Sequence, residues 1–149
     1  MSEDQVAQPT EQQHEVVAIG LWRAVVDVLF AAVLSNVLVH FLLSLALDYS
    51  PGFIPLRLSS VAILTGIAAL GATITLALLR RFSKRPGRIF KRMGWVVLGI
   101  SILLLLGAYL QPGLLPIPAS TPNAFLMLIP FHLVAGVVII GLLGRLSST

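Results

Sequence analysis

The sequence contains no cysteine among its 149 residues. Its absence excludes disulfides, thiol redox chemistry, iron–sulfur clusters and thiolate metal sites. Several catalytic motifs are missing as well: there is no HExxH zinc helix, no G-x-S-x-G nucleophile elbow, no phosphate-binding GxxxxGK and no aspartate pair of the intramembrane-protease kind. We therefore predict a protein that is not an enzyme and carries no resident cofactor.

Charged residues are also scarce. Only 11% of the residues are charged, 57% are hydrophobic, and the mean hydropathy is +0.97. No Asp, Glu, Lys or Arg occurs from Met93 to Gly144. A soluble domain of this size would carry more charge. The composition thus indicates a single-domain protein whose main solvent is the lipid bilayer.

Four apolar stretches are long enough to cross a membrane, because a helix needs about 20 apolar residues to span the hydrocarbon core. A proline-rich segment, residues 111–122, separates the last two. Residues 1–17 are polar and are expected to form a mobile tail. The predicted fold is all-α, with four transmembrane helices in an up-and-down bundle over residues 18–149. The spans are residues 20–47, 58–79, 93–110 and 124–144.

Seven basic residues and no acidic residue lie between the second and third spans. They are Arg80, Arg81, Lys84, Arg85, Arg88, Lys91 and Arg92. Basic residues in short loops stay on the cytoplasmic side. Placing both termini and the 80–92 loop there puts nine of the ten basic residues inside the cell, leaving only Arg57 outside. We predict a multi-pass protein of the cell membrane in this orientation. Contact with anionic lipid headgroups is the alternative role of the cluster, and no nucleic-acid partner is expected.

Arg23 and Asp27 lie four residues apart near the start of the first span. This spacing places them on one face of a helix. We predict an ion pair at the inner interface, which lets both groups sit close to the membrane. Proton transfer by Asp27 is the alternative.

Polar residues inside the spans are candidates for a site, because an unpaired polar group in hydrocarbon is costly. Asn36, His40, Ser44 and Asp48 recur every four residues in the first span and should form one ridge facing the interior of the bundle or a wet crevice, and not the lipid tails. His132 is the matching group in the fourth span. His40 and His132 could ligate haem or a metal, or relay protons. The alternative is that they hydrogen-bond Asn36, a serine or a backbone carbonyl and hold the helices together.

A face of small residues predicts close helix packing in the second span. Its members, which recur at three- and four-residue spacing, are Thr65, Ala68, Ala72 and Thr75. Such a face lets a neighbouring helix approach closely. The neighbour could belong to the same chain or to a second copy.

Two segments, SPGFIPL (residues 50–56) and FLMLIPFHLVAG (residues 125–136), resemble a family of small bacterial four-span membrane proteins of unknown function. The resemblance covers roughly residues 29–146. It implies the architecture and leaves the activity open. In that family methionine commonly precedes the histidine, whereas Phe131 precedes His132 here, which puts a role peculiar to a Met-His pair in doubt.

The sequence thus predicts an accessory or structural subunit without enzymatic activity, whose partners are the bilayer, copies of itself or other membrane proteins. The alternative is a ligand-binding, haem- or metal-binding, or transport module centred on His40 and His132. No inverted repeat and no internally broken helix supports a self-sufficient secondary transporter.

Overall fold

The computed structural model describes residues 8–46, 53–111, 113–115, 117 and 121–146. These residues form four long helices, α1 (Gln8–Ala46), α2 (Leu58–Phe82), α3 (Pro86–Leu110) and α4 (Pro122–Leu146), and the short 3₁₀ helix η2 (Ile54–Leu56). Each long helix contains a stretch that is long and apolar enough to cross a membrane. The spanning stretches are Val25–Leu45, Leu58–Phe82, Pro86–Leu110 and Pro122–Arg145. The all-α, four-span prediction is confirmed.

The first helix begins earlier than expected. α1 starts at Gln8, inside the segment for which a mobile tail was predicted. Pro9 is compatible with this start, because proline is tolerated in the first helical turn. The glutamine, glutamate and alanine residues that follow are good helix formers. A polar sequence therefore excludes burial in the membrane but does not exclude a helix. Residues 1–7 of the predicted tail lie outside the described part of the chain.

The predicted basic loop is mostly helical. α2 continues to Phe82 and α3 begins at Pro86, so that only residues 83–85 connect them. In this turn the backbone N–H of Arg85 donates a hydrogen bond to Ser83 Oγ at 3.2 Å. Pro86 stands in the first turn of α3, where its fixed φ favours a helix start. Arginine and lysine are good helix formers, which explains why the third span begins before Met93.

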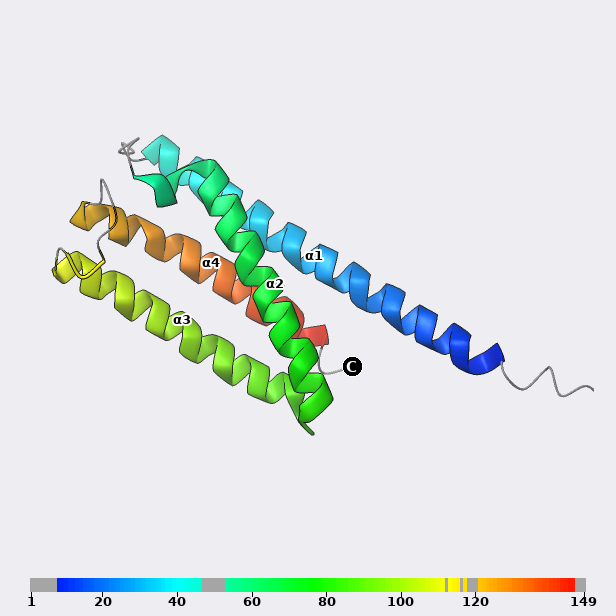
Figure 1. The fold of residues 1–149 in the computed structure, drawn as a ribbon. Helices are drawn as coiled ribbons and strands as arrows, with labels where there is room; N and C mark the ends of the chain where they lie inside the picture. The colour runs from blue at the N-terminus through cyan, green and yellow to red at the C-terminus, as the bar shows by residue number, and fades with distance from the viewer. Residues whose placement is uncertain (1–7, 47–52, 112, 116, 118–120, 147–149) are drawn as a thin grey trace, which may run out of the picture.

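The four helices leave one side of the bundle open. α1 packs against α2 and α4, and α3 packs most closely against α4, whereas α2 touches α3 much less. Figure 1 shows α2 and α3 meeting at their turn and diverging toward the opposite end. We call the end with this turn the basic end, because Arg80, Arg92 and Arg145 belong to helix ends there.

Two buried clusters hold the helices together. The cluster toward the basic end joins all four long helices through Val28, Ala32, Ala69, Leu76, Phe90, Ala135, Ile139 and Leu143. The cluster toward the other end joins η2, α2, α3 and α4 through Phe53, Leu56, Val61, Leu105, Ala108, Ala124, Phe125 and Phe131. α4 contributes to both clusters and packs closely against both α1 and α3, which makes it the central helix of the bundle.

Glycine allows α3 and α4 to approach closely. A Cβ atom added at Gly136 would lie 2.8 Å from Cδ1 of Leu98, and one at Gly94 would lie 2.7 Å from Cγ1 of Ile140. These distances are shorter than a methyl group tolerates, so each glycine receives a large side chain of the opposite helix. Such contacts between small and large residues are typical of helix association in membranes.

Candidate functional site

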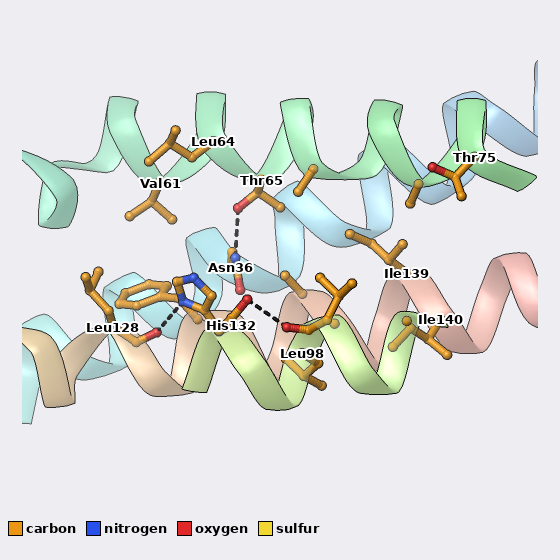
Figure 2. Close-up of a pocket in the computed structure, with 18 of the residues that line it drawn as sticks. Asn36, Val61, Leu64, Thr65, Thr75, Leu98, Leu128, His132, Ile139 and Ile140 are labelled. Atoms are coloured by element: carbon orange, nitrogen blue, oxygen red, sulfur yellow. Dashed lines mark hydrogen bonds between the residues drawn. The ribbon is translucent and has the colours of Figure 1, made fainter. Parts of the chain in front are cut away.

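A groove lies on the open side of the bundle. α4 forms its floor, α2 and α3 form its two rims, and its volume is about 470 Å³. We call it the α2–α3 groove. Along α2 it runs from Val61 to Thr75, a length of about 21 Å at a rise of 1.5 Å per residue. Figure 2 shows the side chains that line it. The groove therefore runs along much of the spanning stretch of α2, Leu58–Phe82.

The groove opens toward the surroundings of the bundle. Its rim residues are exposed, with 57% of Leu64 on α2 and 60% of Val97 on α3 accessible. Its floor is buried and includes Phe131, Ala135 and Ile139 of α4. In a membrane the groove is thus reached laterally, from the lipid tails, and it is lined mostly by apolar side chains.

Asn36 of α1 reaches the groove from behind. The amide nitrogen of Asn36 donates a hydrogen bond to Thr65 Oγ1 of α2 at 2.8 Å, and only 2% of Asn36 and 5% of Thr65 are exposed. The amide oxygen, Oδ1, is buried and has no hydrogen-bond partner. In Figure 2 this oxygen turns away from Thr65. The groove therefore contains an unpaired acceptor near the middle of the first span.

His132 of α4 is the second polar group that matters in the groove. Its Nδ1 lies 3.0 Å from the backbone oxygen of Leu128. A carbonyl oxygen can only accept, so Nδ1 carries a proton, and Nε2 of an imidazole in this tautomer presents a lone pair. Within the described part of the chain, no hydrogen bond to Nε2 is formed. His132 also lies near the middle of its span.

The other hydroxyl groups along the rims are already engaged. Ser101 Oγ donates to the backbone oxygen of Val97 at 2.9 Å, and Thr75 Oγ1 donates to that of Gly71 at 2.8 Å. No Asp, Glu, Lys or Arg is among the described residues that line the groove. The site is therefore uncharged and offers two acceptors, Asn36 Oδ1 and His132 Nε2.

The two histidines of the predicted pair face different surroundings. His40 does not line the groove. Its Nε2 lies 2.9 Å from the backbone oxygen of Leu56 in η2, and its ring centroid is 6.3 Å from that of Phe131. His40 thus connects α1 to η2 and α4, whereas His132, the residue after Phe131, faces the groove. Bonds to backbone carbonyls are one of the alternatives that the sequence left open.

The polar ridge of α1 changes its surroundings along the helix. Asn36 is buried, His40 is half-buried and Ser44 is exposed. Ser44 therefore does not face the interior of the bundle, which was one of the two surroundings expected for the ridge. Its hydroxyl donates to the backbone oxygen of Phe41 at 2.7 Å, so its own helix satisfies it without a neighbour. Asp48 lies outside the described residues.

Nothing in the described part of the chain assembles a metal site. No three His, Asp or Glu side chains there lie close enough together to hold an ion. The haem or metal alternative at His40 and His132 therefore stays a prediction, with no further ligand identified among these residues.

The predicted packing face of α2 lies along the groove. Thr65, Ala68, Ala72 and Thr75 all line it, and Ala68 is exposed. The fully buried residues of α2 are Val61, Thr65, Ala69 and Leu76, of which only Thr65 belongs to the predicted face. Thr65 bonds to α1 and Ala72 packs against the buried cluster at the basic end, so part of the predicted face contacts helices of the same chain, whereas Ala68 does not enter the core. Small residues permit close approach but do not enforce it, and the bulkier Val61 and Leu76 direct the packing of α2.

The charged side chains that the structure describes lie at the surface. All seven members of the basic cluster are exposed, and the Arg81 guanidinium lies over the Phe82 ring, 5.7 Å from its centroid. Arg23 and Asp27 are both exposed on α1, and no ion pair joins these two described side chains. The exposed position explains this, since water or headgroups can solvate each charge separately.

Sequence reasoning found Asn36, Thr65 and His132 separately but did not bring them together. The hydrogen bond between α1 and α2 and the angle between α2 and α3 create the site, and neither leaves a periodic signal in the sequence. Ser101 and Gly136, which also line the groove, were not predicted as site residues.

Comparison with known proteins identifies a family for this chain but no activity. No curated protein and no solved structure matches the chain. The model of a family of unknown function (DUF6069) matches residues 14–149, which include all four spanning segments. This agrees with the resemblance to a family without known function, whereas the bacterial origin stays a prediction. With this match over nearly its whole length, the chain belongs to that family of unknown function, DUF6069.

Proposed function

We propose that this protein is a non-enzymatic membrane protein that binds a small lipophilic molecule from the bilayer in the α2–α3 groove. The observation that carries the proposal is an apolar groove with unpaired polar atoms at mid-membrane depth. Its volume of about 470 Å³ falls within the range of about 300–1,000 Å³ that is typical of ligand sites. The proposal moves the predicted binding module from the pair His40 and His132 to Asn36 and His132.

Native mass spectrometry of the protein released gently from its own membrane tests this function. We expect a bound lipophilic molecule on the wild-type chain and its loss from Ala68→Phe, because the phenyl group enters the groove from its α2 rim. Ala77→Phe is the matched control, since Ala77 is an exposed alanine of α2 that does not line the groove, and it should retain the molecule. Equal retention by the two variants would contradict the proposal.

A second candidate is an accessory subunit that receives a helix of another membrane protein or of a second copy. The small residues Thr65, Ala68, Ala72 and Thr75 along the groove favour it, because they let a foreign helix approach. The same spectra separate the two candidates. A second polypeptide mass that Ala68→Phe removes, without any small bound molecule, would support the subunit function.

We also propose that the basic end of the bundle and both termini face the cytoplasm. The exposed cluster and Arg145 at helix ends on one side support this orientation. A green fluorescent protein fused after residue 149 should fluoresce, and alkaline phosphatase fused there should be inactive. Fusions after Gly113, between α3 and α4, should give the opposite pattern. An active phosphatase at the C-terminus would reverse the orientation.

A further inference from the structure

The two unpaired acceptors restrict what the groove can recognise. We propose that the α2–α3 groove selects a neutral lipophilic molecule bearing a hydroxyl group, which donates its hydrogen to Asn36 Oδ1 or His132 Nε2 while the apolar part lies along the floor of α4. This inference rests on the proposed function and adds the chemical class of the ligand.

Asn36 supplies the first reason. An amide oxygen that is buried without a partner costs free energy, and the cost is highest where no water is available. Asn36 lies near the middle of the span Val25–Leu45, far from either membrane surface. Its amide nitrogen is held by Thr65, which fixes the direction of the oxygen. The oxygen is therefore a pre-oriented acceptor that a donor from the ligand would satisfy.

His132 supplies the second reason. The bond from Nδ1–H to Leu128 fixes both the tautomer and the ring orientation, so that Nε2 presents a lone pair. His132 and Asn36 line the same groove from α4 and α1. A single hydroxyl needs only one of these acceptors. A diol or a hydroquinone could use both.

Charge excludes the other common headgroups. A carboxylate or phosphate would face two acceptors, and no basic residue is among the described residues of the lining to balance it. An ammonium would carry its charge into hydrocarbon, which is costly at this depth. An ether or an alkane fits the apolar floor but offers no donor. A hydroxyl group is the smallest neutral donor and leaves the least polar surface unpaired.

The test uses three probes with twelve-carbon chains: dodecanol, its methyl ether and dodecanoic acid. The full chain in detergent is titrated with each probe, and occupancy is read by native mass spectrometry. We expect dodecanol to bind about tenfold more tightly than the ether, the effect of one hydrogen bond of about 1.4 kcal/mol. Dodecanoic acid at pH 8 should bind more weakly than dodecanol.

Variants then assign the preference to the acceptors. At least one of Asn36→Leu and His132→Phe should reduce the preference for the alcohol over the ether, and the double variant should abolish it, while the affinity for the ether stays nearly unchanged. Ser101→Ala is the control, because this hydroxyl lines the groove but already donates to Val97. It should keep the full preference. Thermal unfolding of each variant verifies that the bundle is intact.

The outcomes separate this inference from the function on which it rests. If alcohol and ether bind the wild-type chain equally, the groove binds lipophiles and hydroxyl recognition is wrong. Tighter binding of the acid would also overturn the inference. If none of the three probes binds, and no lipophile is retained from the native membrane, the proposed function itself fails.

Discussion

Thr65→Val should destabilise the bundle by about 1–2 kcal/mol, although the two side chains have nearly the same shape. The substitution removes the only partner that the structure gives to the Asn36 amide nitrogen. Because Oδ1 is already unpaired, the amide would then be buried with no hydrogen bond at all. Polar contacts between membrane helices are worth about 0.6 kcal/mol on average, and leaving a buried group unsatisfied costs more. Unfolding in mixed detergent micelles measures the change.

The double variant Asn36→Leu/Thr65→Val makes this prediction specific. Removing both partners also removes the unpaired oxygen. The free energy of unfolding of the double variant should therefore lie within about 0.5 kcal/mol of the wild-type value or above it. Thr65→Ser keeps the hydroxyl and should cost less than Thr65→Val. If the double variant loses as much stability as Thr65→Val, the fit of the added valine methyl and not the hydrogen bond determines the effect.

Whether substitutions at positions 36 and 65 raise or lower the free energy of unfolding bears on the function of Asn36. A protein selected for stability alone would gain from leucine at position 36, because a buried amide with one unsatisfied atom is unfavourable. Asn36 therefore has the character of a binding residue whose cost is offset when a ligand donates to it. If Asn36→Leu is more stable than the wild-type chain and has also lost the preference for the alcohol, the same side chain both destabilises the bundle and recognises the ligand.

The spans could be predicted because hydrocarbon imposes a simple rule on sequence. Every backbone group in the core must be satisfied within a helix, so length and apolar character suffice. The rule does not apply outside the core. For this reason the helical stretch from Gln8 and the helical basic residues from Pro86 onward were missed, although both contain good helix formers.

The groove could not be predicted, because lipid-facing and groove-facing residues have the same composition. Leu64 and Val97 are exposed on the rims, and Ile63 and Val96 beside them are exposed as well. Only the divergence of α2 from α3 decides which of these residues line a cavity. The small residues Ala68 and Ala72 signalled a place where something approaches closely, but not whether a helix or a ligand does so.

Gly136→Val should destabilise the protein by about 1–3 kcal/mol, the usual cost of inserting atoms into a filled contact. The new Cβ would lie within 3 Å of both Cδ atoms of Leu98, so α3 must move away from α4 or Leu98 must change its rotamer. Gly141→Val is a matched control on the same helix, since nothing lies within 4 Å of a Cβ at that position. Unfolding in mixed micelles compares the two.

A double-mutant cycle assigns the cost to this contact. Leu98→Ala removes the atoms that the new side chain would meet and leaves a void of its own, so it should destabilise the wild-type chain. Combined with Gly136→Val it should cost less than the sum of the two single changes, with a coupling of about 0.5–3 kcal/mol. Additive effects, or equal losses in Gly136→Val and Gly141→Val, would mean that close approach of α3 and α4 at Gly136 does not stabilise the bundle. Because α4 is the floor of the groove and α3 is its rim, a positive coupling would also identify the contact that keeps the rim in place.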